Sequence, residues 1–279
     1  MTVFIELLKS ILYGIVEGIT EWLPVSSTGH LILLGEFCPL HVSPAFSEMF
    51  DVVIQLGAIL AVIVLFFYKL NPFSPQKSSL EKKSTWGLWF RVLVAVIPSG
   101  IVGILLDDWL DATLYNYITV AVALIVYGVV FLLIEHFKPE GSARVTDARQ
   151  LTYRTAFLIG VFQVLALIPG TSRSGATILG AMLLGCSRGA AAEFSFFLAI
   201  PTMLGAGGLK VIKLILSDVT ITPLEWGILA VGCLSAFLVS LAVIRFLTDF
   251  VRRHSFAPFG LYRLILGLLV AGSVLLGVL

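Results

Sequence analysis

The chain has 279 residues, of which 58% are hydrophobic and only 13% are charged, and its formal net charge is +1. A soluble domain averages about 25% charged residues, so this composition excludes an ordinary soluble domain and predicts an integral membrane protein. The apolar runs are long and do not alternate with polar residues, which favours helices over a barrel. The charge balance carries no sign of a nucleic-acid partner, and we expect none.

Six apolar runs are long enough to cross a bilayer, which takes roughly 20 residues. They lie near 50–68, 86–106, 115–135, 190–212, 224–246 and 258–279. Four further apolar pieces are too short or too interrupted to span, near 4–20, 28–38, 153–168 and 175–185. These pieces form two pairs, 4–20 with 28–38 and 153–168 with 175–185, and a polar motif joins the two members of each pair. We therefore expect two re-entrant helix pairs. The predicted fold is all-α and polytopic, with six transmembrane helices plus these two pairs.

The distribution of basic residues between the loops predicts the orientation, because loops rich in Lys and Arg stay cytoplasmic. The basic loops are 69–85, 136–154 and 247–257. In contrast, 107–114 has three aspartates and no basic residue, and 214–223 has no basic residue, although Lys210 and Lys213 lie just before it. We therefore expect the three basic loops inside the cell and the other two outside.

This orientation makes the first re-entrant pair enter from the outer face and the second from the cytoplasmic face. Each half then has one pair and three spans, and because three is odd, the second half is inverted. We expect one integral membrane domain over 1–279, with a first repeat at 1–135 and an inverted second repeat at 153–279. Broken helices of inverted repeats meet near the bilayer midplane, so the two motifs should face each other at a buried or wet cavity.

The first motif begins with two carboxylates. Glu17 and Glu21 are four residues apart, so on a helix they share one face. Two close carboxylates hold a divalent cation, or their pKa values separate so that one acts as a base. The plainer alternative is that both acids reach to the membrane interface. In the second motif the matching positions are Gln163 and Leu167, so only one half supplies the acids.

Hydroxyls and an imidazole follow these acids. Pro24 and Gly29 bracket a segment that is typical of a turn between two short helices, with Ser26, Ser27 and Thr28 before His30. Each hydroxyl alone is better interpreted as a helix cap. The set taken together with His30 favours function, and a serine nucleophile with a histidine base is one chemistry that it supports.

The second motif carries an arginine among apolar residues. In register, the segment 172–175 matches 26–29, and glycines and hydroxyls again precede a helix, where backbone N–H groups bind anions. Arg173 adds a planar fork that suits phosphate oxygens, and Thr177 lies on the same helix face. The alternative is a structural salt bridge from Arg173 to an acid of the first motif. The candidate substrate-binding residues are Ser26, Thr28, Gly170, Ser172, Ser174 and Thr177.

Weaker signals lie outside the motifs. Glu193 and Ser195 either line the cavity or lie at the membrane interface, and Gln55 is a candidate cavity residue. The spacing Gly14-xxx-Gly18 favours close helix packing, either within the chain or between two copies, which leaves a homodimer open.

Taken together, the two motifs resemble those of the undecaprenyl-diphosphate phosphatases, also called bacitracin resistance proteins. The similarity extends over essentially the whole chain and is most specific at the two motifs. The segments that carry it are 17–21, 24–30, 50–57, 169–177, 192–197 and 201–202.

The resemblance implies a multi-pass enzyme of the bacterial plasma (inner) membrane. Such an enzyme hydrolyses undecaprenyl diphosphate to undecaprenyl phosphate and inorganic phosphate, which recycles the lipid carrier for cell-wall synthesis and gives bacitracin resistance. The resemblance also implies an active site open to the outer side, a divalent cation (Mg²⁺ or Ca²⁺), and a polyprenyl diphosphate and membrane lipids as partners. The implied site residues are Glu17, Glu21, Ser27, His30, Ser172, Arg173 and Thr177.

The sequence leaves the mechanism open. Ser27 attacks with His30 or a carboxylate as base, or His30 is the nucleophile, or water attacks directly. A lipid transporter is the competing class, because inverted repeats with half-helices at the midplane suit transport. The set formed by the two acids, Ser27 and His30 favours the enzyme, since transport needs no nucleophile beside a base.

Overall fold

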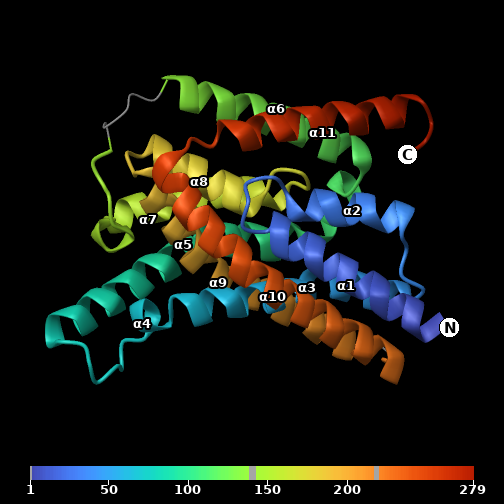
Figure 1. Cartoon of the computed structure of the whole chain (residues 1–279), viewed down its shortest axis with the longest axis horizontal. Helices are drawn as coiled ribbons and strands as arrows, with labels where there is room; N and C mark the ends of the chain where they lie inside the picture. Colours follow the sequence, from blue (N-terminus) through green and yellow to red (C-terminus); the bar gives the residue numbers. More distant parts are fainter. Residues whose placement is uncertain (1, 138–142, 217–219) are drawn as a thin grey trace.

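The computed structural model describes residues 2–137, 143–216 and 220–279, and within them it is helical, with a single isolated bridge between Val145 and Cys186 (Figure 1). The helices are α1 (Thr2–Thr20), α2 (Ser27–Phe37), α3 (Pro44–Leu65), α4 (Phe67–Leu70), α5 (Ser79–Leu114), α6 (Tyr117–Phe137), α7 (Tyr153–Val164), α8 (Arg173–Leu183), α9 (Arg188–Leu216), α10 (Pro223–Arg253) and α11 (Ala257–Leu275). Two short 3₁₀ turns lie at Ala148–Gln150 and Leu165–Leu167.

Six of the described helices are long and apolar enough to cross a membrane: α3, α5 over Ser79–Leu106, α6, α9, α10 and α11. The prediction of an all-helical chain with six such helices is confirmed. Two of these helices begin about one turn or more before the apolar runs, because polar caps define their starts. Ser43 caps α3 just before Pro44, and Ser78 forms a capping box with Glu81 at the start of α5.

The helices pack mainly in pairs. The helix α1 lies along α10, α3 packs between α10 and α9, α7 lies along α5, and α6 and α11 form a separate pair, visible at the top of Figure 1. Glycines allow several backbones to touch. A Cβ on Gly57 would lie 2.2 Å from the carbonyl oxygen of Cys233, and one on Gly160 would lie 2.1 Å from that of Ala95.

The Gly14-xxx-Gly18 spacing is used inside the chain. A Cβ on Gly14 would lie 2.4 Å from the carbonyl oxygen of Gly232, and one on Gly18 would lie 2.8 Å from that of Ala236. Both contacts are with α10. The sequence left open whether this spacing serves packing within the chain or between two copies. The structure shows packing within the chain, so the spacing gives no argument for a homodimer.

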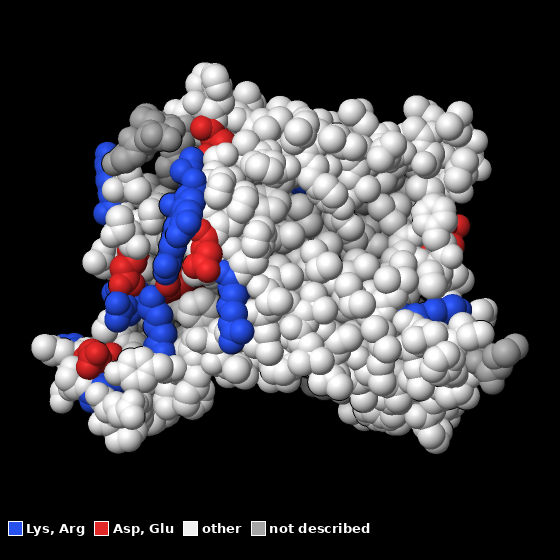
Figure 2. All heavy atoms as spheres, in the orientation of Figure 1, with Lys and Arg blue, Asp and Glu red and all other residues white. Residues whose placement is uncertain are grey.

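Most charged side chains on the face seen in Figure 2 gather at one end, a few lie at the opposite end, and the broad middle of that face is almost without them. In Figure 1 the same end holds the loop after α4, the described part of the loop between α6 and α7, and the junction of α10 with α11. These are the three loops predicted to share one side of the membrane. Ion pairs join helices there, including Lys69 with Glu193 and Arg188 with Glu135.

Candidate active site

Each motif forms a turn with the same unusual backbone. Ser26 and Ser172 each have a φ of 75°, and they are the non-glycine residues with positive φ in the described part of the chain. The Ser26 Oγ accepts from the N–H of Gly29 at 3.3 Å, and the Ser172 Oγ accepts from the N–H of Gly175 at 3.1 Å. Both serines are therefore caps, of α2 and α8. Left-handed backbone in a residue with a side chain costs energy and tends to occur at functional sites.

The two motif turns meet each other. The Ser174 hydroxyl is within hydrogen-bond distance of two carbonyl oxygens of the first motif, those of Glu21 at 3.0 Å and Leu23 at 3.2 Å. Both turns lie near the middle of the long dimension of the molecule, as Figure 1 shows by their blue and yellow colours. The expected juxtaposition of the motifs is therefore observed.

The carboxylate of Glu21 joins the two motifs chemically. Its Oε2 accepts from the Ser27 hydroxyl at 2.5 Å, and its Oε1 accepts from Arg173 Nη2 at 2.8 Å. The Glu21 side chain is 4% exposed and that of Arg173 is 10% exposed. The salt bridge that the sequence offered as an alternative for Arg173 is thus present, and its partner is Glu21. A carboxylate in contact with a hydroxyl is also placed to accept that hydroxyl's proton.

Arg173 has a second set of contacts on α9. Its Nη1 donates to the carbonyl oxygen of Ser195 at 2.6 Å and to the Ser195 hydroxyl at 3.1 Å. The Ser195 hydroxyl also lies 2.7 Å from that of Thr177, and the arginine lies over the Trp22 ring at 5.8 Å. Ser195 therefore belongs to the site rather than to the interface. Glu193, two residues earlier, pairs with Lys69 instead, toward the charged end of the molecule.

Glu17 is fully buried, and neither of its carboxylate oxygens has a hydrogen-bond partner among the described residues. A carboxylate buried in this way carries either a proton or a counter-ion, because an unpaired buried charge is very unfavourable. Within the same residues no group of three or more His, Cys, Asp or Glu side chains is arranged to hold a metal. A cation bound here would thus have to complete its shell with ligands from the substrate or water.

The ring nitrogens of His30, one of the two bases that the sequence left open for Ser27, contact Ser26 and Tyr262. Its Nδ1 lies 2.6 Å from the carbonyl oxygen of Ser26, and its Nε2 lies 2.6 Å from the Tyr262 hydroxyl on α11. A carbonyl only accepts, so Nδ1 carries the proton, and in the neutral ring Nε2 accepts from the tyrosine. Of the two bases left open for Ser27, the carboxylate of Glu21 is the one in contact with it.

The remaining candidates have different surroundings. Gly170 has a φ of 90°, and a Cβ there would lie 2.7 Å from the carbonyl oxygen of Val120, which explains the glycine. Thr28 is partly exposed in the first turn of α2. Gln55 donates to the carbonyl oxygen of Asp51 in its own helix at 3.4 Å, which gives no sign of a cavity role.

Two residues of α11 contact the motif turns but were not among the site residues predicted from the sequence. Arg263 is fully buried and donates to carbonyl oxygens of both motif turns, and Tyr262 contacts His30. The sequence held one signal, since Arg263 is the lone charged residue in the apolar run 258–279. An ionisable residue inside an apolar span is a functional hypothesis by default.

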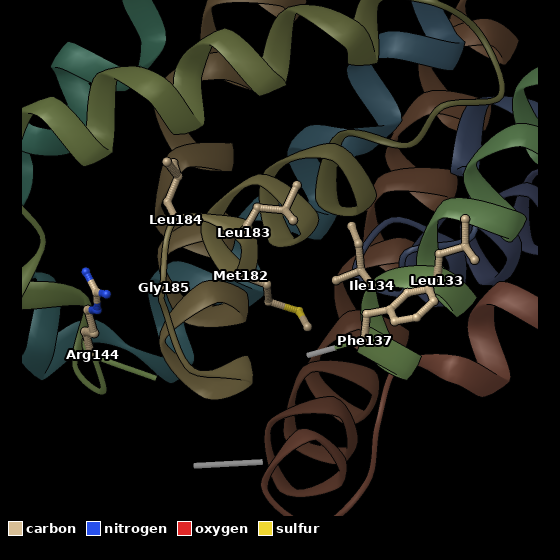
Figure 3. Close-up of a pocket in the computed structure, with 8 residues that line it drawn as sticks. All are labelled: Leu133, Ile134, Phe137, Arg144, Met182, Leu183, Leu184 and Gly185. Atoms are coloured by element: carbon tan, nitrogen blue, oxygen red, sulfur yellow. The ribbon is translucent and has the colours of Figure 1, made fainter. Parts of the chain in front are cut away.

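A pocket of about 530 Å³ lies elsewhere, between the C-terminal parts of α6 and α8 (Figure 3). Its lining residues are Leu133, Ile134, Phe137, Arg144, Met182, Leu183, Leu184 and Gly185. None of the candidate site residues contributes to it, so it is separate from the motif turns.

A helical membrane protein whose two polar turns meet at a buried carboxylate and arginine is the class that this fold and site define. Residues 10–269 match the family model described as bacitracin resistance protein BacA, and the chain belongs to that family. It is 56% identical over 272 residues to an undecaprenyl-diphosphatase of Streptococcus equi subsp. equi, which covers 97% of this chain and 98% of the relative. Similar matches are the undecaprenyl-diphosphatases of Streptococcus thermophilus (55% over 266 residues, 95% and 92%) and Enterococcus faecalis (54% over 269 residues, 96% and 98%).

Proposed function

We propose that this chain hydrolyses undecaprenyl diphosphate to undecaprenyl phosphate and inorganic phosphate. The family and the full-length relatives named undecaprenyl-diphosphatase support this reaction. The structural observation that carries it is the contact of Glu21 with both the Ser27 hydroxyl and the Arg173 guanidinium. A hydroxyl, a base and a cation at one point are the groups that phosphoryl transfer requires.

In the mechanism that we favour, the Ser27 oxygen attacks the terminal phosphorus while its proton passes to Glu21. A bond forms between Ser27 Oγ and phosphorus, the phosphoanhydride bond breaks, and the polyprenyl phosphate leaves. Water then hydrolyses the phosphoserine and releases inorganic phosphate. Arg173 and the N–H groups at the start of α8 would hold the phosphate oxygens, whose negative charge they stabilise.

A divalent cation, Mg²⁺ or Ca²⁺, fits the donors of the site. The unpartnered carboxylate oxygens of Glu17 are hard ligands that suit either ion, and Glu21 follows one turn later. Mg²⁺ typically uses one or two carboxylates plus substrate phosphates, which agrees with the small number of acids here. When bound, the cation would neutralise phosphate charge.

We further propose that the chain is an inverted repeat in the bacterial plasma membrane, with re-entrant pairs α1–α2 and α7–α8. In support, the packing of α1 and α3 on α10 is mirrored by that of α7 and α9 on α5. Each pair also returns to the side from which it starts. Lys9 Nζ, within the first half of α1, donates to the carbonyl oxygen of Pro39 after α2 at 2.7 Å, and the N–H of Arg144, in the segment before α7, donates to that of Gly185 after α8 at 2.8 Å.

The site would open to the outer side of the membrane. The α1–α2 pair begins and ends at the end of the molecule opposite to the charged one (Figure 1), and basic loops are cytoplasmic by the usual bias. The polyprenyl diphosphate would then reach the site from the outer side of the membrane, and the surrounding membrane lipids would contact the chain.

The first test is phosphate release from a polyprenyl diphosphate by the purified chain in detergent, with Mg²⁺ or with a chelator. Arg173→Ala should lose the activity, and removing one positioned donor typically costs about 100- to 1000-fold. Arg91→Ala is a matched control, because this arginine of α5 lies over the Tyr153 ring. If folded wild-type protein released no phosphate, the hydrolase would be refuted, and lipid transport in vesicles would be the next assay.

A further inference from the structure

Arg263 on α11 connects the two motif turns through their backbones. Its Nη1 donates to the carbonyl oxygen of Pro24 at 3.1 Å, and its Nη2 donates to that of Gly170 at 2.7 Å. A longer contact of 3.4 Å joins Nη2 to the carbonyl oxygen of Ala123 on α6. The side chain is fully buried.

The two turn carbonyls are equivalent positions. When Ser26 is placed over Ser172, Pro24 falls over Gly170, so one guanidinium holds the same point of both turns. The fork of the arginine, with donors fixed in a plane, is suited to spanning two acceptors. Arg263 therefore bridges the two turns directly, beside the contacts of Ser174 with the first turn.

The helix that carries Arg263 is itself held tightly against α6. A Cβ on Gly128 would lie 2.9 Å from the carbonyl oxygen of Gly260, and one on Gly260 would lie 3.0 Å from that of Gly128. The backbones of α6 and α11 thus touch one turn away from Arg263. A guanidinium on such a support has little freedom to move.

The neighbouring Tyr262 contacts the first motif. Its hydroxyl lies 2.6 Å from His30 Nε2, and the two rings are parallel, with centroids 5.7 Å apart. With Nδ1 bonded to the Ser26 carbonyl oxygen, this contact fixes both nitrogens of the imidazole. A second group that fixes the tautomer and orientation of a site histidine is a common device.

We propose that Tyr262 and Arg263 are positioning residues: Arg263 holds the two motif turns in register across the site, and Tyr262 fixes the His30 ring. This inference rests on the proposed function, because the second turn would bind the phosphate oxygens of the polyprenyl diphosphate while Ser27 of the first turn attacks its terminal phosphorus and the polyprenyl phosphate leaves.

Simple packing does not account for Arg263. No ion pair within the described residues includes it, and its Nε is buried without a partner. Its charge is balanced by carbonyl oxygens and by the Tyr127 ring at 5.5 Å. A buried cation without a carboxylate is costly, and an apolar side chain would fill the same volume at lower cost. The donors of the fork are therefore the reason for an arginine.

The test compares Arg263→Lys and Arg263→Met with wild type and with Arg91→Lys as the control. Methionine keeps the packing and removes every donor, whereas lysine keeps the charge and loses the fork. Two readouts are needed: kcat and KM for phosphate release, and hydrogen–deuterium exchange in peptides covering 21–30 and 168–177. Tyr262→Phe is paired with Tyr13→Phe, whose hydroxyl donates to the Cys38 carbonyl oxygen away from the turns.

For both Arg263 variants we expect kcat to fall about 100-fold with little change in KM, since misplacing reacting groups by about 1 Å costs that much. Exchange should rise in both motif peptides and not in the other helices. Tyr262→Phe should lower kcat about tenfold, as loss of a group orienting a site histidine does.

Wild-type kcat in folded variants would overturn the proposal. So would exchange that rises equally throughout the chain, since this would reveal a general packing role. If the wild type released no phosphate, the proposed function would fail, and exchange in the two motif peptides would still decide whether Arg263 holds the turns.

Discussion

Replacing Glu21 by Gln is the sharpest test of the proposed chemistry. Both carboxylate oxygens are in use, one accepting from Ser27 and one from Arg173. Glutamine has nearly the same shape but offers one oxygen and one NH₂ group. The NH₂ group cannot accept from the arginine, so the amide oxygen must turn toward Arg173 and the NH₂ group toward Ser27.

The expected magnitude follows from these two contacts. The base for the Ser27 proton is lost, and a positioned base typically contributes about 100- to 10,000-fold, so kcat should fall by that factor. The contact with Arg173 survives as a bond to a neutral oxygen. Arg173 is nevertheless left buried without its carboxylate. Removing one partner of a buried ion pair costs about 3–5 kcal/mol, and because one hydrogen bond is kept, this range is the upper limit for the fall in the free energy of unfolding.

The assay is burst-phase and steady-state phosphate release, with thermal unfolding measured on the same samples. Glu36→Gln is the matched control, since Glu36 on α2 accepts from Tyr117 at 2.7 Å and touches neither Ser27 nor Arg173. If Glu21→Gln kept more than a tenth of the wild-type kcat in a folded sample, Glu21 would not be the base.

Three further perturbations have expected outcomes. Gly57→Ala should lower the unfolding temperature, because its Cβ would lie 2.2 Å from the Cys233 carbonyl oxygen and overpacking costs about 1–3 kcal/mol, whereas Gly205→Ala, with open space around it, should raise or keep it. Ser195→Ala removes one acceptor of Arg173 Nη1 and keeps the other, the Ser195 carbonyl oxygen, so kcat should fall by less than the roughly 100-fold that loss of one positioned donor typically costs. Glu17→Gln should raise the Mg²⁺ concentration for half-maximal phosphate release, and an unchanged Mg²⁺ titration would contradict a cation at Glu17.

Much of the fold could be predicted because span length and loop charge are properties of local sequence. The apolar runs locate the six described helices that are long and apolar enough to cross a membrane, and the basic loops gather at one end. The predicted starts of two helices were less accurate. Ser43 and Ser78 cap α3 and α5 within polar segments, so these helices begin before the apolar runs from which they were predicted. Which helices pack together depends on glycines such as Gly160 and on contacts far apart in sequence, and no local pattern specifies these.

The site was predictable where its residues share a turn or a helix face. The turns place Glu21, Ser27 and Arg173 together, as the register of the two motifs suggested. The partner of His30 was not predictable, because Tyr262 lies 232 residues away and appears in sequence as one more aromatic residue in an apolar run. His30 as the base for Ser27 was one of the options that the sequence left open, and packing against α11 instead brings its Nε2 to Tyr262.

The two motif turns have a similar backbone conformation but contribute different chemical groups to the site. Ser26 and Ser172 have the same φ and cap equivalent helices, yet the residues that follow them, Ser27 and Arg173, are a hydroxyl and a cation. Both reach the same carboxylate, that of Glu21. The position equivalent to Glu17 is Gln163, which donates to the Ser99 hydroxyl at 2.6 Å and takes no part in the site. Because the backbone turns are alike, the difference in function between the halves resides in side chains, so exchanging Ser27 and Arg173 should abolish phosphate release while leaving both caps intact.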